Sequence, residues 1–272
     1  MAKNGTRTEQ VLSFLHARVN LGDSVENLQK AYREAKPFPH LVLDNFFSPE
    51  ILEGLLDELP PFDSEKWIHE RYQQMVKSNL RSACDLGKRG FEFVSEIHSA
   101  GFLYLMSELT GVRALLPDPY LTASGYQAVP EGGKFDIHAD RNADHFTGMR
   151  RSSVMITYLN KDWTSGLGGE LELYNEDATR CEKVVEPLFN RVVIFEIADK
   201  NFHAVRPVTS GLGAMRRSFS CYFHVVENNF VAHNSLWAPS VYREFESPWR
   251  KIPRELVPPL LLRALRRKKR MM

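Results

Sequence analysis

The chain has 272 residues, of which 43% are hydrophobic and 11% are aromatic, and its formal net charge at pH 7 is +1. This length allows one large domain or two small ones, and the apolar content is enough for a sizeable core, which excludes a disordered chain. A net charge so close to zero argues against a protein-wide positive field, so we expect no nucleic-acid partner.

Residues 1–36 are interpreted as a polar leader followed by a helix. Met1 to Gln10 lacks the apolar stretch of a signal peptide, and no run of 18 apolar residues occurs, so we expect a cytoplasmic protein. The helix is predicted around Val25 to Ala35. Pro37-Phe38-Pro39 ends it, because proline cannot continue the hydrogen-bond ladder of a helix.

Two further helices and a short strand are predicted before residue 120. His40 to Leu43 is a strand candidate. Ser48 is suited to the N-cap of the next helix and Pro49 to its first position. A long helix is predicted from about Glu92 to Leu109, where apolar residues recur at helical spacing.

From Leu121 onward the sequence consists of short segments in which apolar and polar residues alternate. Many short strands separated by glycine-rich turns indicate a jelly roll rather than βαβ units. We therefore predict a mainly β (α+β) protein, with helices packed outside a double-stranded β-helix that spans residues 37–228. The segments with period two are 134–140, 153–158, 169–174, 191–197 and 216–223.

Residues 229–272 are predicted to form a C-terminal extension with a basic tail. Its end, Arg254 to Arg270, is rich in Leu and Arg, a composition that fits either an anionic membrane surface or a short docked helix with a solvated tail. We favour the solvated tail. Trp237 and Trp249 in this segment are interpreted as packing residues.

A candidate metal site comes from two distant segments. In a strand, alternation places His138 and Asp140 on one face together with Asp136, and Phe135 on the other. We propose His203, which follows an apolar strand, as the third ligand. Two histidines and one carboxylate occupy one face of an octahedron and leave three positions open, as a non-haem Fe(II) oxygenase requires. The alternative for each histidine taken alone is an ordinary surface or hydrogen-bonded residue.

A candidate anion site lies on the last strand. Arg216 and Ser218 share one face, whereas Arg217 shares the other with Phe219. A guanidinium can hold a carboxylate through two parallel hydrogen bonds, and Ser218 can donate a third. The alternative is an edge strand with a solvated arginine pair. Because Arg216 lies on the polar face of the strand and Arg217 on the face with Phe219, we favour Arg216 as the anchor.

Taken together, these residues resemble the 2-oxoglutarate/Fe(II)-dependent oxygenase superfamily, in particular its prolyl 4-hydroxylase-like branch. The resemblance runs over about Pro37 to Phe223. The motifs that carry it are Gly132-Gly133-Lys134 to Asp140, Tyr158-Leu159-Asn160-Lys161-Asp162-Trp163, Gly168-Gly169-Glu170-Leu171, Pro187-Leu188-Phe189-Asn190-Arg191, His203 and Arg216-x-Ser218.

The resemblance implies a role for each candidate residue. His138, Asp140 and His203 would bind Fe(II), and Arg216, Tyr158 and Ser218 would bind the cosubstrate 2-oxoglutarate, with O2 as the oxidant and ascorbate as a supporting reductant. No side chain is expected to be catalytic beyond the iron ligands. Because Asp140 keeps the carboxylate that related halogenases replace with a small residue, hydroxylation is favoured.

The predicted function is thus a 2-oxoglutarate- and Fe(II)-dependent dioxygenase that hydroxylates a C–H bond of a peptide or a small molecule. Arg150-Arg151, near the metal strands, either attracts an anionic substrate or forms a solvated turn. Two other functions stay open at this point: a zinc-dependent hydrolase or isomerase, and a non-catalytic jelly-roll binding protein. The sequence does not indicate an oligomeric state.

Overall fold

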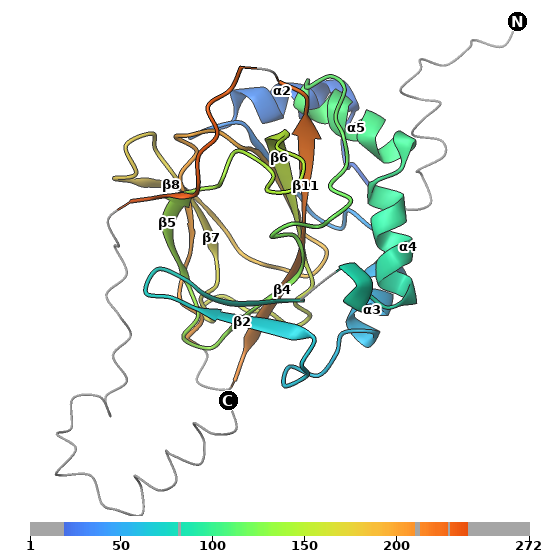
Figure 1. Cartoon of the computed structure of the whole chain (residues 1–272), viewed down its shortest axis with the longest axis vertical. Helices are drawn as coiled ribbons and strands as arrows, with labels where there is room; N and C mark the ends of the chain where they lie inside the picture. The colour runs from blue at the N-terminus through green and yellow to red at the C-terminus, as the bar shows by residue number, and fades with distance from the viewer. Residues whose placement is uncertain (1–18, 81–82, 210–212, 228, 239–272) are drawn as a thin grey trace, which may run out of the picture.

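The computed structural model describes residues 19–80, 83–209, 213–227 and 229–238 (Figure 1). Its helices are α2 (Val25–Glu34), α3 (Pro49–Asp57), η1 (Ala83–Asp85), α4 (Lys88–Ile97) and α5 (Ala100–Thr110). Its strands are β1 (His40–Leu43), β2 (Trp67–Arg71), β3 (Val76–Leu80), β4 (Gly125–Pro130), β5 (Phe135–Ala139), β6 (Arg150–Tyr158), β7 (Leu171–Tyr174), β8 (Cys181–Val185), β9 (Val192–Glu196), β10 (His203–Val205), β11 (Met215–Val225) and β12 (Leu236–Trp237).

These strands form two antiparallel sheets that face each other. The larger sheet has the order β1-β9-β6-β11-β4-β3-β2, and the smaller has the order β12-β5-β10-β7-β8. Neighbouring strands in both sheets are mostly distant in sequence, as when β6 pairs with β9 and β11. The two sheets enclose an interior between β5 and β7 on one side and β4, β6 and β11 on the other (Figure 1). The predicted jelly roll with flanking helices is confirmed.

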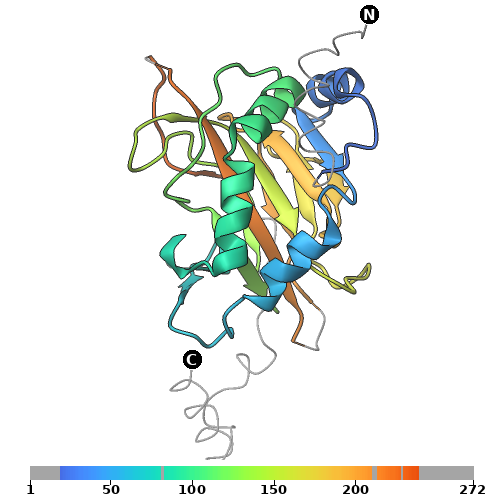
Figure 2. The ribbon, with the colours of Figure 1, turned by 90° about the vertical axis from the view of Figure 1, so that its right-hand side faces the viewer.

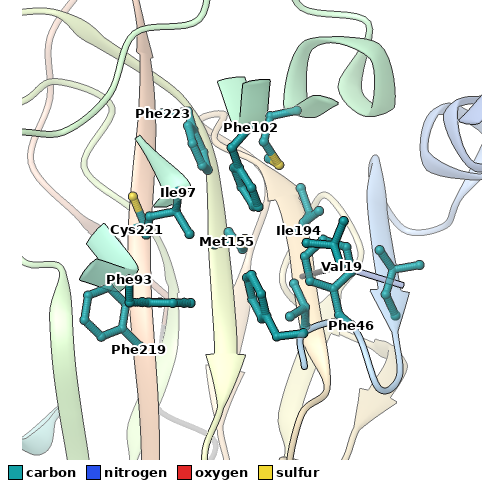
Figure 3. Packing of buried hydrophobic residues seen from close by; sticks show 14 of the residues in the cluster. Val19, Phe46, Phe93, Ile97, Phe102, Met155, Ile194, Phe219, Cys221 and Phe223 are labelled. Atoms are coloured by element: carbon teal, nitrogen blue, oxygen red, sulfur yellow. The ribbon is translucent and has the colours of Figure 1, made fainter. Parts of the chain in front are cut away.

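The helices cover the outer face of the larger sheet, where α4 and α5 lie across its strands (Figure 2). The core between these layers is rich in aromatic rings. Phe219 of β11 meets Phe93 of α4 edge to face, with ring centroids 5.1 Å apart, and Phe102 of α5 packs on Phe223 (Figure 3). Such contacts stabilise the packing of the helices on the outer face of the larger sheet.

The helix predicted from Glu92 to Leu109 is two helices in the structure. α4 ends at Ile97, and Ser99 caps α5 by accepting a hydrogen bond from the Phe102 amide. Ser99 is a residue type that caps helices, and it interrupts an otherwise apolar helical pattern, so the first helix ends and the second begins there. The helix before Pro37 is confirmed as α2. Ser48 stands at the N-cap of α3 as predicted, although its side chain bonds Glu50 instead of a backbone amide.

The strands that alternation predicted are present, with ends shifted by a few residues. The β2–β3 hairpin was not predicted, because its two strands are largely polar and most of β2 is exposed. Residues 236–237 add β12 to the smaller sheet beside β5. The division at residues 36 and 228 stays a prediction. The basic tail and Trp249 lie outside the described residues, among which no helix is long and apolar enough to cross a bilayer.

A candidate metal centre and its pocket

The three predicted metal ligands come together at the inner face of the smaller sheet. β5 and β10 pair so that His203 lies directly opposite His138, and Asp140 follows the end of β5. Asp140 Oδ1 is 3.4 Å from His138 Nε2 and 3.7 Å from His203 Nε2. The three candidate ligand atoms all lie within 4.8 Å of one another. Two donors that each lie about 2.1 Å from one metal ion are at most about 4.2 Å apart, and both Asp140–histidine distances are within that limit.

Hydrogen bonds orient these side chains for a metal. His138 Nδ1 is 2.8 Å from the carbonyl oxygen of Asp136, and His203 Nδ1 is 3.1 Å from that of Asn201. Because a carbonyl only accepts, each Nδ1 carries the proton, and each Nε2 presents its lone pair to the shared centre. The Tyr222 hydroxyl donates to Asp140 Oδ2 at 2.9 Å and leaves Oδ1 directed at the histidines. The donor set therefore fits a divalent metal with a vacant face.

The electrostatics of the triad also suit a cation. Burial opposes ionisation of Asp140, but the nearby imidazoles of His203 and His138 outweigh it and hold the pKa of this carboxyl well below its ordinary range. Burial and the neighbouring His138 lower the pKa of His203 to about 4. The carboxylate of Asp140 and the neutral imidazole of His203 are the protonation states that bind metal.

One detail of the predicted strand face is wrong. Phe135 lines the same cavity as His138 and Asp140, whereas Asp136 is fully buried and pairs with Lys134 at 2.7 Å. The pairing of β5 with β10 shifts register between His138 and Phe135, which indicates a β-bulge. An extra residue at a bulge reverses the alternation beyond it, and for this reason Asp136 is not part of the triad.

Arg216 reaches the same cavity from the larger sheet. It is 3% exposed, its Nε donates to the carbonyl of Gly169 at 2.8 Å, and its Nη2 lies 3.2 Å from the Tyr158 hydroxyl. The side chain of Arg217 is exposed. The structure thus puts Arg216, and not its neighbour, in the wall of the cavity, which has a volume of about 260 Å³.

The other two predicted cosubstrate residues, Tyr158 and Ser218, differ in their position relative to the cavity. Ser218 lines the cavity, and within the described part of the chain its buried hydroxyl has no hydrogen-bond partner. Tyr158 lies behind the guanidinium, with its ring centroid 4.9 Å from the Arg216 Cζ. Burial raises the pKa of Tyr158, so its hydroxyl stays protonated. Within the described residues the Tyr158 hydroxyl accepts a hydrogen bond from Arg216, and direct binding of a cosubstrate by Tyr158 stays a prediction.

The motifs after Tyr158 have a structural explanation. Asn160 Oδ1 accepts the Arg217 backbone amide, which fixes which arginine points inward. Trp163 Nε1 donates to the Gly168 carbonyl. A Cβ at Gly168 would lie 1.9 Å from the carbonyl oxygen of Pro207, and one at Gly169 would crowd Arg216 Cδ at 3.1 Å. Both glycines also have positive φ, so this turn admits no larger residue beside Arg216.

The structure places two further residues in the cavity wall, Arg151 and Trp237. Arg151 is buried, with its guanidinium 3.9 Å from the centre of the Tyr222 ring, so it does not belong to a solvated turn. Trp237 stacks on His138, with ring centroids 4.8 Å apart, and lines the cavity from β12. No sequence signal pointed to Trp237, because its position depends on the pairing of β12 with β5.

Comparison with known proteins agrees with this site. The model of the 2OG-Fe(II) oxygenase superfamily matches residues 122–224, which include the triad and Arg216. The chain belongs to the 2-oxoglutarate/Fe(II)-dependent oxygenase superfamily.

Two similar proteins have curated names. Over 193 residues the chain is 30% identical to the prolyl 3-hydroxylase OGFOD1 of Mus musculus, which covers 69% of this chain and 33% of that protein. Over 234 residues it is 27% identical to the prolyl 3,4-dihydroxylase OGFOD1 of Ostreococcus tauri, which covers 80% of this chain and 42% of that protein. The chain therefore spans less than half the length of these curated relatives.

Solved structures show the same fold. A prolyl-4-hydroxylase from Pseudomonas putida matches with a TM-score of 0.54 at 17% identity, covering 74% of this chain and 98% of that one. A prolyl hydroxylase from Trichoplax adhaerens, in complex with a peptide fragment of hypoxia inducible factor, matches with a TM-score of 0.53 at 16% identity, covering 82% and 94%.

Proposed function

We propose that the chain is a 2-oxoglutarate- and Fe(II)-dependent dioxygenase of the prolyl hydroxylase type. The observation that carries this proposal is a single cavity with a metal-binding triad on one sheet and a buried arginine on the other. His138, Asp140 and His203 would hold Fe(II), and Arg216 and Ser218 would hold the distal carboxylate of 2-oxoglutarate. Fe(II) and 2-oxoglutarate would together supply the oxidation of a C–H bond by O2, with succinate and CO2 as products.

The residues of this chain contribute position and the exclusion of water. Arg216 is held by Gly169 and Tyr158, so its guanidinium is oriented before an anion arrives. Through this bond Tyr158 positions Arg216 for the cosubstrate. The apolar side chains of Leu171 and Phe195 line the cavity and limit the access of water to the reacting atoms. We assign no side chain the role of a general acid or base.

The proposed substrate is a prolyl residue of a polypeptide, because the curated relatives are named prolyl hydroxylases. A small molecule is the second candidate. We further propose that ascorbate supports turnover and that the protein acts in the cytoplasm. A zinc hydrolase offers no role for Arg216, and none of the comparisons supports it.

Succinate formation from 2-oxoglutarate in air tests this proposal. We expect it to require Fe(II), to fail with Zn(II), and to be lost in the double variant His138→Ala with Asp140→Ala. Asp57→Ala is the control, since Asp57 is exposed at the end of α3 and should retain activity. Succinate release that is unchanged in the double variant would refute the mechanism. Omission of ascorbate should lower the total turnover but not the initial rate.

A further inference from the structure

A second cavity continues from the metal cavity. It has a volume of about 340 Å³ and lies between the β2–β3 hairpin and the loop that precedes β4. The two cavities share Lys77, Thr122 and Ala123 in their walls. We call the second cavity the side groove. A substrate residue at the metal would have its chain neighbours within reach of this groove.

Two aromatic rings flank the side groove and face solvent. Tyr120 is 58% exposed and Phe146 is 67% exposed, yet their ring centroids are only 5.3 Å apart. Ile68 of β2 is a third exposed apolar residue of this groove. Exposed apolar side chains that gather at a cavity, as opposed to single scattered ones, mark a binding site.

The loops that carry the two rings are locally fixed. Asp144 Oδ1 accepts hydrogen bonds from the amides of Phe146 and Thr147, and Ala143 bridges to Arg150 at the base of the loop. In the other loop the Ser124 hydroxyl donates to Asp118. The pair of rings is therefore presented in a defined arrangement, which reduces the entropy lost when a ligand binds.

The backbone beside Tyr120 is strained. Leu121 has φ of 49° and Ala123 has φ of 57°, and neither is a glycine. Both residues line the side groove, and Ala123 also lines the metal cavity. Left-handed backbone at such residues costs about 1–3 kcal/mol and clusters at ligand-binding sites.

Polar groups in the groove indicate what it binds. Within the described residues, the buried atoms Thr122 Oγ1 and Asn79 Oδ1 have no hydrogen-bond partner, and both residues line the groove. Leaving such groups unsatisfied is unfavourable, and the amides of a polypeptide would satisfy them. A hydrocarbon chain of a lipid would fill the same space without relieving either group.

We propose that the side groove binds a polypeptide segment of the substrate, with a large apolar side chain packed against the paired rings of Tyr120 and Phe146 and its peptide groups bonded by Thr122 and Asn79. This inference rests on the proposed function, since it describes the neighbours of the residue that is oxidised at the metal. It makes Tyr120 and Phe146 specificity-determining residues.

The test uses glycine-rich peptides with one central proline, in which phenylalanine replaces glycine at each flanking position in turn. Affinity is measured by calorimetry under argon with Fe(II) and 2-oxoglutarate present, so that no turnover occurs. We expect phenylalanine at one position or more to tighten binding about tenfold, the gain from burying one large apolar side chain. The double variant Tyr120→Ala with Phe146→Ala should lose this preference. Phe91→Ala, which removes an exposed ring from α4, should keep it.

A second variant tests the peptide contacts. Thr122→Val removes a hydroxyl with little change of shape, and it should weaken the binding of glycine and phenylalanine peptides by a similar factor, about threefold to tenfold. Decanoate is the comparison probe. If decanoate binds as tightly as the best peptide and is insensitive to Thr122→Val, the occupant is an acyl chain and the proposal is overturned.

The outcomes separate this proposal from the function it rests on. A phenylalanine preference without succinate formation in air would refute the oxygenase and leave the groove in place. Succinate formation without any phenylalanine preference, or a preference that survives in the double variant, would refute the groove alone. Thermal unfolding of each variant checks that the loops still fold.

Discussion

The two faces of β11 contrast most clearly in this molecule. On the inner face Arg216, Ser218 and Tyr222 line the metal cavity. On the outer face Phe219 and Cys221 are fully buried under the helices (Figure 3). Because side chains alternate along a strand, neighbouring residues of β11 thus belong either to a polar site or to an apolar core.

The register of β11 places both the polar residues of the cavity and the apolar residues of the core. A slip of a single residue would put the aromatic rings in the cavity and the arginine in the core. The register is fixed by Asn160, which bonds the Arg217 backbone, and by pairing with β4 and β6 along the strand. Substitutions on the outer face should therefore change stability, and those on the inner face should change binding.

The largest effect is expected on the outer face. Phe219 meets Phe93 and Tyr126 edge to face, with centroids 5.1 Å and 5.0 Å away. Phe219→Ala should lower the free energy of unfolding by about 3–5 kcal/mol, because it leaves a cavity in a close-packed core. Urea unfolding measures this loss, and the folded fraction should still bind 2-oxoglutarate. A loss below about 1 kcal/mol would mean that this face is not a packed core.

Substitutions on the inner face of β11 should change ligand affinity. Arg216→Ala should weaken 2-oxoglutarate binding about 100-fold, because a buried charge-assisted anchor is lost. The control is Arg217→Ala, the neighbouring residue with an exposed side chain, which should change the affinity less than about threefold. Calorimetric titration with 2-oxoglutarate gives both values. If the two variants have equal effects, Arg216 is not the anchor.

The jelly roll was predictable from the sequence because its strands alternate clearly and glycine turns separate them. The β2–β3 hairpin was not, since its strands are largely polar and mostly not buried, which leaves no alternation to detect. The residue Trp237 was missed for a related reason. Its contact with His138 arises from a strand only two residues long, and local pattern does not indicate which distant strand it joins.

At the site, residue types and parity identified the triad and favoured Arg216 over Arg217. Sequence could not reveal the bulge in β5 that excludes Asp136, because a bulge depends on the partner strand β10. It also could not show that Tyr158 lies behind Arg216. The types of side chain indicate the chemistry of a site. The face of the strand from which each side chain points depends on pairing with distant strands.

A smaller effect on ligand affinity is expected at Ser218, on the inner face of β11. Ser218→Ala removes a buried hydroxyl that has no partner among the described residues. We expect 2-oxoglutarate affinity to fall about threefold to tenfold, since one hydrogen bond is lost. The free energy of unfolding without ligand should stay equal or rise slightly. If unfolding is instead destabilised by more than about 1 kcal/mol, the hydroxyl has a structural role and Ser218 is not reserved for a ligand.

The smallest expected effect concerns a titratable group behind the outer face. His98, at the end of α4, lies 3.3 Å from the Cys221 thiol through its Nε2. Burial, assisted by the nearby His224, lowers the pKa of His98 to about 4. In the unfolded chain the pKa of histidine is about 6.5. Between these values the unfolded state binds more protons, so acidification favours unfolding.

The stability that His98 contributes should therefore be fully present above pH 6.5 and be lost progressively as the pH falls toward 4. His98→Gln removes this term, so the free energy of unfolding of the variant should decline less than that of the wild type between neutral pH and pH 5. We expect a difference of about 1 kcal/mol, reduced from the full shift because His98 is only partly buried. Urea unfolding of both proteins measures it, and titrations common to the two cancel in the comparison. Parallel pH profiles would show that His98 is protonated as readily in the folded protein as in the unfolded chain, and the outer face of β11 would then be open to water at this end.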